Sequence, residues 1–196
     1  MPKREVAPLV VRDVRLRLLE SHDLAHTLMW RNQDENRQWF VHSEPVSWEN
    51  HLRWFQHYQQ RDDDLVFIAE ATGDPSCPIG QASLYHIDWT SRSAEFGRLL
   101  IGEPAARGRG LGREITRALL ELGFNAWGLT RVHLEVLAHN TRAIGIYLHC
   151  GFQPVTTRDN LLIMELFREG WAGSADGRDS LLGRASPCNL DAENTV

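Results

Sequence analysis

The chain has 196 residues, a length that suits one globular domain with a sizeable hydrophobic core. Its formal net charge of −5 argues against a nucleic-acid-binding protein, because such proteins need clustered positive charge. The three cysteines, Cys77, Cys150 and Cys188, are widely spaced and match neither a metal-ligand spacing nor a disulfide framework. We therefore expect no bound metal and a reducing, cytoplasmic location.

The two ends of the chain differ in composition from its centre. Residues 1–10 carry charge but no long apolar core, and no run reaches about 18 apolar residues. We therefore expect neither a signal peptide nor a membrane span. After Glu169 the sequence turns to Gly, Ser, Asp and Asn with few large apolar residues. This change predicts a folded domain over residues 1–169 and a polar, flexible tail over residues 170–196.

Hydrophobic periodicity predicts strands and helices of an α/β protein along the domain. Alternating or short apolar runs predict seven strands, at residues 14–19, 65–71, 79–87, 95–101, 131–138, 152–155 and 161–166. Helical spacing of apolar residues predicts four helices, at residues 22–30, 47–59, 111–124 and 140–150. No internal repeat is evident, so these elements are expected to form a single domain.

A glycine-rich segment from Arg107 to Gly112 lies between a predicted strand and a long predicted helix. Glycines let a ligand approach the backbone, and the first turn of a helix offers unpaired N–H groups and the positive end of its dipole. Such a place suits a phosphate or pyrophosphate. A Walker loop is excluded because Arg113 and Glu114 follow Gly112, and the G-x-G-x-G spacing fits a Rossmann motif poorly. A glycine turn without a ligand stays open as the alternative.

A second motif follows about thirty residues later. A strand-like run at 131–138 leads to Asn140, a natural helix N-cap, and Tyr147 lies seven residues further on the same helix face. Gly151 and Phe152 then end the helix. The strand, Asn-x-x-Ala, Tyr and Gly-Phe resemble the second motif of the GCN5-related N-acetyltransferase (GNAT) family. The earlier segment resembles that family's Gln/Arg-x-x-Gly-x-Gly/Ala loop, and two motifs in this order are a specific signal.

The resemblance, which covers roughly residues 14–166, implies an α/β fold of a defined kind. It implies a central, mixed, mostly antiparallel sheet of about seven strands flanked by about four helices, with strands 4 and 5 splayed to admit acetyl-CoA. The pantetheine arm would pair with backbone at the end of strand 4, and the pyrophosphate would lie on the loop N–H groups. The implied donor-binding residues are Leu100, Ile101, Gly102, Arg107, Gly108, Arg109, Gly110, Leu111, Gly112, Arg113 and Asn140.

The resemblance also implies catalytic roles for two residues. Tyr147 matches the tyrosine that gives a proton to the departing thiolate, and a core tyrosine that packs helix on sheet is the alternative. Glu95 begins a strand at a position where relatives often place a carboxylate that accepts a proton directly or through water. An exposed strand-end acid is the alternative for Glu95, and His86, Asp88 or a bound water are further candidates for the base.

The acceptor side is expected between the first strand and the second helix. Residues 29–55 hold four of the seven tryptophans, and the phrases Trp-Arg-Asn and Arg-x-Trp-Phe resemble enzymes that acetylate the 4-amino group of nucleotide-linked sugars, such as the pseudaminic-acid pathway enzyme. Aromatic rings can stack on a uracil or sugar face, and an arginine can hold a diphosphate. The expected substrate-binding residues are Arg31, Asn32, Arg37 and His86.

Other functions stay open at this point. Enzymes that acetylate the N-termini of ribosomal proteins share similar early helices. An aminoglycoside or another small amine is a further possible acceptor, although residues 62–64 form the only acidic run. From another class, a non-catalytic acyl-CoA-binding module is disfavoured by Tyr147 and the intact glycine loop. The acyl-chain length and a homodimeric state are also left open.

Overall fold

The computed structural model describes residues 3–12, 14–72 and 77–171. The predicted tail over residues 170–196 falls almost entirely outside the described residues. Within the described residues, no helix is both long and apolar enough to cross a membrane.

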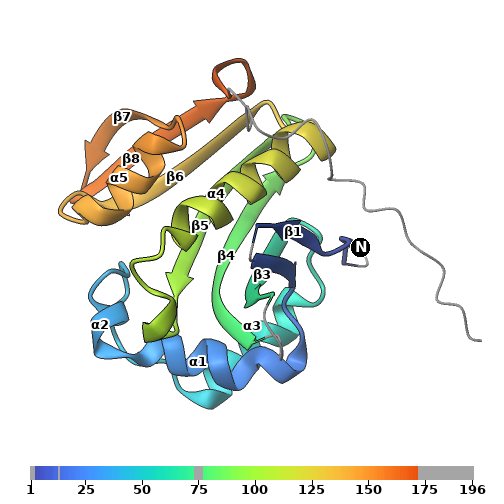
Figure 1. Ribbon diagram of the computed structural model, residues 1–196, viewed down its shortest axis with the longest axis vertical. Coiled ribbons are helices and arrows are strands. Elements are labelled where there is room, and N and C mark those ends of the chain that lie inside the picture. Colours follow the sequence, from blue (N-terminus) through green and yellow to red (C-terminus); the bar gives the residue numbers. More distant parts are fainter. Residues whose placement is uncertain (1–2, 13, 73–76, 172–196) are drawn as a thin grey trace, which may run out of the picture.

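One open sheet runs through the molecule (Figure 1), in the order β1-β2-β3-β4-β5-β6-β8-β7. Neighbouring strands pair antiparallel, except that β5 and β6 are parallel. The strands are β1 (Leu9–Val11), β2 (Val14–Leu18), β3 (Asp64–Ala71), β4 (Cys77–Asp88), β5 (Ser93–Ile101), β6 (Arg131–Leu137), β7 (Gln153–Arg158) and β8 (Leu161–Phe167). The predicted mixed, mostly antiparallel sheet is confirmed, and β1 is one strand more than the seven predicted.

Five α-helices form within the described residues: α1 (Leu24–Asn32), α2 (Asp34–Arg37), α3 (Trp48–Tyr58), α4 (Leu111–Glu121) and α5 (Thr141–His149). The sequence predicted four of them and missed α2. Ser47 caps α3, because its hydroxyl accepts the N–H of Asn50 at 3.3 Å. The helix predicted over 111–124 is α-helical only to Glu121, and a π-helical turn, Leu122–Ala126, continues it.

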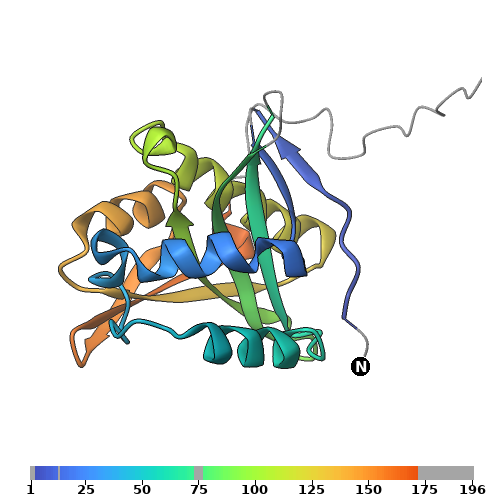
Figure 2. The same ribbon diagram turned by 90° about the horizontal axis from the view of Figure 1, so that it is seen from below.

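Both faces of the sheet are buried, as β3 shows most clearly. Successive side chains of a strand point to opposite faces. Leu65 and Phe67 join the large core beneath α4 and α5, whereas Val66 and Ile68 join a smaller core with α1 and α3. The helices therefore cover the sheet from two sides, and Figure 2 shows α1 and α3 on one side of it. Burial on both faces explains why β3 is an almost continuous apolar run.

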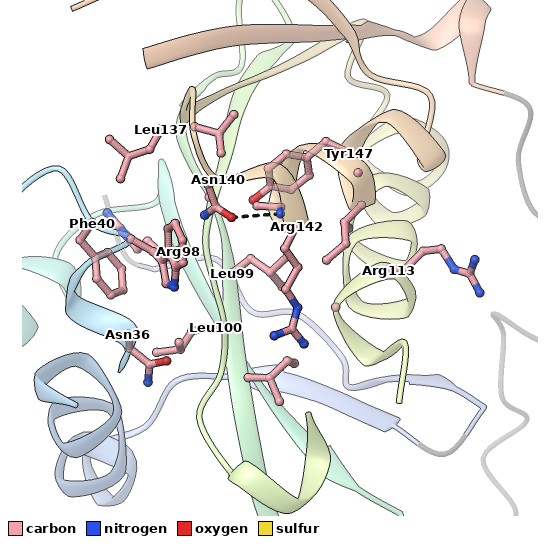
Figure 3. A pocket seen from close by; sticks show the side chains of 18 of the residues that line it. Asn36, Phe40, Arg98, Leu99, Leu100, Arg113, Leu137, Asn140, Arg142 and Tyr147 are labelled. Atoms are coloured by element: carbon pink, nitrogen blue, oxygen red, sulfur yellow. Dashed lines mark hydrogen bonds between the residues drawn. The ribbon is translucent and has the colours of Figure 1, made fainter. Parts of the chain in front are cut away.

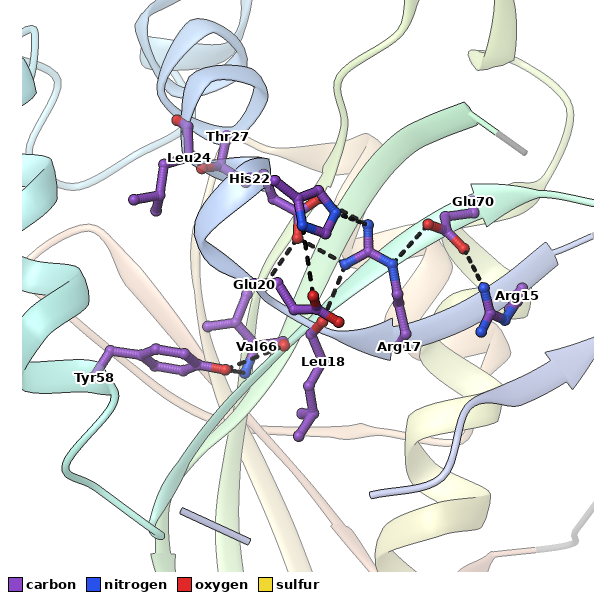
Figure 4. A network of polar contacts seen from close by, with 11 residues as sticks. Arg15, Arg17, Leu18, Glu20, His22, Leu24, Thr27, Tyr58, Val66 and Glu70 are labelled. Atoms are coloured by element: carbon purple, nitrogen blue, oxygen red, sulfur yellow. Dashed lines mark hydrogen bonds and ion pairs between the residues drawn. The ribbon is translucent and has the colours of Figure 1, made fainter. Parts of the chain in front are cut away.

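A polar network fixes the start of α1 against the sheet (Figure 4). Arg17 on β2 donates to both carboxylate oxygens of Asp23, at 2.7 and 2.8 Å, and to Glu70 at 2.7 Å. Asp23 also accepts the N–H of Glu20 at 2.8 Å, and its side chain is 1% exposed. Burial alone would raise the pKa of Asp23, but the hydrogen bonds from Arg17 and Glu20 outweigh it and lower the pKa.

Strands β5 and β6 pair over only three residues each, from Ser93↔Arg131 to Glu95↔His133. Beyond this point they separate (Figure 1), and neither strand has the other as a neighbour. These are the strands predicted to splay as the fourth and fifth, and they carry later numbers because β1 precedes them. The split sheet positions the site.

Candidate active site

A cavity of about 980 Å³ opens where β5 and β6 separate. Its walls come from the end of β5, the glycine loop, the first turn of α4, the inner side of α5 and the segment around α2 (Figure 3). Ligand cavities in enzymes commonly span about 300–1,000 Å³, so this one has room for a large cofactor together with a substrate.

A β-bulge shapes the β5 wall. Gln81 pairs with Leu100 and Ser83 with Gly97, so that Arg98 and Leu99 together oppose a single residue of β4. Arg98 is left-handed, with φ of 52°, a conformation that costs a non-glycine residue about 1–2 kcal/mol. Backbone strain of this kind is concentrated at functional sites.

The side chain of Arg98 holds the bulge in place. Its guanidinium donates to both carboxylate oxygens of Asp64, at 2.6 and 3.1 Å, and lies 4.3 Å from the ring centroid of Tyr85. Because β6 pairs with β5 only as far as Glu95, the edge of β5 over residues 97–101 faces the cavity instead of another strand. A ligand with amide groups, such as pantetheine, can pair with that edge as a strand would.

The glycine loop takes the shape that an anion site needs. Gly108 and Gly110 have φ of 76° and 78°, and Gly110 is the N-cap of α4. The N–H of Arg113 bonds to the carbonyl of Gly110 at 3.0 Å, so the N–H groups of Leu111 and Gly112 precede the first bond of the helix. The loop fits a pyrophosphate through its main chain and the helix dipole.

The predicted donor-binding residues are distributed unequally. Those that line the cavity are Leu100, Ile101, Arg107, Gly108, Gly110, Leu111, Gly112, Arg113 and Asn140. Gly102 and Arg109 do not line it. Gly102 instead packs against Trp30, since a Cβ at this position would lie 2.2 Å from the indole ring. The guanidinium of Arg113 makes only a long contact of 3.9 Å with Glu114 within the described residues, which leaves it available to a phosphate.

Tyr147 lies in the cavity wall on α5 (Figure 3), in the second turn of that helix. The side chain of Asn140 caps this helix, because its Oδ1 accepts the N–H of Ala143 at 3.1 Å. The Tyr147 ring meets Phe96 and Phe152 edge-on, with centroids 5.9 Å away in both cases. Burial raises the pKa of Tyr147, so the phenol keeps its proton at neutral pH and can donate it.

Glu95 lines the same cavity and is held by two neighbours. The Tyr85 hydroxyl donates to Oε1 at 2.5 Å, and Nδ1 of His86 lies 2.9 Å from Oε2. Burial, together with the hydrogen bond to Glu95, raises the pKa of Tyr85, so Tyr85 stays a donor. The backbone of His86 is left-handed, with φ of 48°, at a second bulge. Its side chain is 62% exposed and does not line the cavity.

The predicted acceptor residues separate into two groups. Arg31 lines the cavity, stacks 4.1 Å above the Phe40 ring and has a buried Nη1 atom without a partner in the described structure. Burial and the nearby charge of Arg37 lower the pKa of Arg31. Arg37 and Asn32 do not line the cavity. The side-chain amide of Asn32 donates to the carbonyl of Val46 and accepts the N–H of Val46, each at 2.8 Å.

Several cavity residues were missed by the sequence analysis. Tyr85 on β4 pairs directly with Glu95 on β5, so the register of these two antiparallel strands would have indicated the contact. Trp39 was noted as an aromatic residue but not placed in the site, and it lines the cavity beside His139, with ring centroids 5.8 Å apart. Asn36 was missed because α2 was not predicted.

Comparison with known proteins agrees with this geometry. The family model described as acetyltransferase (GNAT) domain matches residues 13–153. The aminoglycoside N(6')-acetyltransferase type 1 of Klebsiella pneumoniae is 29% identical over 160 residues, which cover 74% of this chain and 78% of that protein.

Two solved structures share the fold. The spermidine N-acetyltransferase of Vibrio cholerae in complex with CoA and spermine has a TM-score of 0.70 and 23% identity, over 82% of this chain and 98% of that one. Apo FdhC, a nucleotide-linked sugar GNAT, has a TM-score of 0.72 and 22% identity, over 84% and 92% of the two chains. The chain belongs to the GNAT acetyltransferase family and is an acetyl-CoA-dependent N-acetyltransferase.

Proposed function

We propose that the protein transfers the acetyl group of acetyl-CoA to the primary amine of a nucleotide-linked sugar, by direct attack in a ternary complex. The observation that carries this proposal is the state of Arg31, a cavity arginine with a buried guanidinium nitrogen that has no partner in the described structure. Its neighbour Phe40 lies on the opposite side of the cavity from Arg113 (Figure 3).

An unpaired buried donor is unfavourable, and a ligand anion would satisfy it. The guanidinium fork matches two oxygens of a diphosphate. Arg37, in the same segment, likewise has a buried Nε without a partner among the described residues, while its Nη1 donates to Ser43 at 3.1 Å. Phe40 and the 43% exposed Trp39 add aromatic faces that suit a nucleobase or a sugar ring.

The chain's own groups supply the proton transfers that the reaction needs. We assign Glu95, already bonded by Tyr85, to accept the proton that the attacking amine loses. We assign Tyr147 to give its proton to the sulfur as the C–S bond breaks and the C–N bond forms. Tyr147 then regains a proton from solvent. The donor itself is assigned to the edge of β5 and to the loop N–H groups described above.

A polycationic amine is the second candidate, and two observations favour it. Glu95 and Glu135 both line the cavity, and carboxylates suit a cationic substrate. One relative is named for an aminoglycoside and one structural neighbour for spermidine. The positive charge of Arg31, whose Nη1 has no partner among the described residues, opposes this candidate, because like charges repel.

Thiol release from acetyl-CoA tests the proposal with four acceptors: a UDP-linked 4-amino sugar, spermidine, an aminoglycoside and an N-terminal peptide. We expect turnover with the sugar. Arg31→Ala should raise the KM for the sugar about 10- to 100-fold, since a hydrogen bond to a charged group contributes about 1.5–3 kcal/mol, and should leave the KM for acetyl-CoA unchanged.

Arg53→Ala is the matched control, because Arg53 is an exposed arginine on α3 that contacts only Asn50, at 3.4 Å, in the described structure. It should change neither constant. Turnover with spermidine or the aminoglycoside alone, or an unaltered sugar KM in Arg31→Ala, would contradict the proposed acceptor and leave the donor site unaffected.

A further inference from the structure

Arg107 begins the glycine loop, yet its side chain points back along the chain, away from that loop. Nε donates to the carbonyl of Ile101 at 3.1 Å, and Nη2 lies 3.3 Å from the carbonyl of Gly102. These bonds hold the guanidinium against the end of β5. Only 22% of the side chain is exposed.

The same guanidinium also reaches α2, some seventy residues earlier in the sequence. Nη1 donates to Glu35 at 2.5 Å, while Nη2 donates to Gln33 at 3.0 Å and lies 3.5 Å from the side-chain oxygen of Asn36. Arg107 therefore joins three points on or beside α2 to two carbonyls at the end of β5. Its nitrogens already have hydrogen-bond partners within the protein, whereas the guanidinium of Arg113 has only the 3.9 Å contact with Glu114 in the described structure. The side chain of Arg107 is therefore poorly placed for a phosphate.

Helix α2 depends on such ties because it has four residues, too few to be stable alone. A buried side-chain anchor is Asn36, which is 6% exposed and donates to the carbonyl of Trp30 at 2.8 Å. Asn36, Trp39 and Phe40 line the cavity, so the position of α2 sets the acceptor wall. The wall and the donor loop are thus connected through one arginine.

We propose that Arg107 is a positioning residue that couples the two halves of the site: a donor that fixes the loop over residues 108–113 also fixes Arg107, and Arg107 then orders α2 and the acceptor wall. The coupling predicts that donor binding favours acceptor binding, and by linkage the reverse. It goes beyond the proposed acceptor and holds whichever amine is acetylated.

Hydrogen exchange with CoA as the only ligand tests the coupling without an acceptor. The reporting amides are those of Asn36, Arg37, Trp39 and Phe40, which bond to carbonyls at Gln33, Asn36 and Arg37 at 2.9–3.0 Å. In the wild-type protein, CoA should slow exchange of a peptide covering residues 33–42 at least about fivefold, in addition to its effect on residues 108–113.

Arg107→Lys is the informative variant, because it keeps the positive charge but loses the planar fork. We expect the Kd for CoA, measured by calorimetry, to stay within about threefold of wild type, while CoA no longer slows exchange in residues 33–42. Gln33→Ala removes one partner on the α2 side without touching the loop. It should reduce the same protection and leave the Kd unchanged, which guards against a folding defect in the lysine variant.

Arg113→Ala should behave in the opposite way. It should raise the Kd for CoA about tenfold through loss of a phosphate contact, and saturating CoA should still protect residues 33–42. The coupling is wrong if CoA leaves exchange of residues 33–42 unchanged in the wild-type protein. It is also wrong if Arg107→Lys retains the CoA-dependent protection, or if Arg107→Ala weakens CoA binding as much as Arg113→Ala does, because Arg107 would then act as a phosphate ligand.

Discussion

The two halves of the cavity are built from different parts of the chain. The donor half, consisting of the β5 edge, the glycine loop and the starts of α4 and α5, offers mainly backbone groups in fixed conformations. The acceptor half, residues 31–43, offers side chains that are held by carbonyls of the same segment. A short motif can specify backbone geometry, whereas a few substitutions can change a side-chain pocket. This difference explains how one fold can include similar proteins that are named for aminoglycosides, for spermidine and for nucleotide-linked sugars.

Tyr147→Phe gives the largest expected effect, because it removes the proposed proton donor to the departing sulfur. The phenylalanine keeps the ring contacts with Phe96 and Phe152, so the thermal unfolding midpoint should be unchanged. We expect kcat to fall about 10²- to 10³-fold, with the KM for acetyl-CoA unaltered. Steady-state thiol release measures both constants.

The raised pKa of Tyr147 adds a pH test to the same variant. The phenol stays protonated up to and beyond its ordinary value of 10.0, so the wild-type rate should show no alkaline fall caused by Tyr147 below that pH. A phenylalanine variant that keeps more than a tenth of the wild-type kcat would show that another group protonates the sulfur.

Asp23→Asn tests the network by which Arg17 fixes the start of α1, the helix that leads into the acceptor half. Breaking this buried pair should lower the free energy of unfolding by about 2–3 kcal/mol, while the Kd for acetyl-CoA should stay the same. Because the folded pKa of Asp23 is lowered from 3.8, its stabilisation is present above that pH and is lost as the pH falls through the folded pKa. The free energy of unfolding of the wild-type protein should therefore decrease in acid by this contribution. The asparagine variant, which has no carboxylate at this position, should not show that decrease.

Asp63→Asn is the comparison for this experiment. Asp63 also pairs with an arginine, Arg61, at 2.7 Å, but the two side chains are 34% and 45% exposed. An exposed pair contributes little, so the change should be less than about 0.5 kcal/mol in chemical denaturation. Equal losses in Asp23→Asn and Asp63→Asn would argue that the network does not anchor α1.

Gly110→Ala tests the backbone of the donor half and should have the smallest effect. Alanine at φ of 78° costs about 1 kcal/mol of stability, and the altered loop should weaken acetyl-CoA binding several-fold. Gly145→Ala in α5 is a matched control, because an added Cβ meets no heavy atom within 4 Å at either position. In a helix the same substitution should stabilise the protein by up to about 1 kcal/mol. A loss of stability at both positions would mean that space, and not conformation, limits Gly110.

The sequence predicted those features that depend on local pattern. The alternation in β6, the N-cap Asn140 and the glycine loop all specify their own conformation, and each lies where it was expected. Strand β1 was missed because three residues give too short a pattern, and α2 was missed because its four residues carry no apolar repeat.

The partners of individual side chains were beyond sequence reasoning. Arg107 was expected at the pyrophosphate, but its partners Gln33 and Glu35 lie more than seventy residues earlier, and only the folded chain brings them together. His86 was expected to bind substrate, yet the bulge on β4 directs it to Glu95. Motifs predict which backbone a ligand meets, whereas the assignment of charged side chains needs the tertiary structure.

A crystal structure of the protein with bound CoA would test the contrast between the two halves most directly. We predict that the pyrophosphate oxygens accept backbone N–H groups of residues 108–113, while the guanidinium of Arg107 remains on Gln33 and Glu35. A structure in which the Arg107 side chain leaves α2 and binds the pyrophosphate would contradict this account, because the donor half would then depend on the same kind of side-chain contact as the acceptor half.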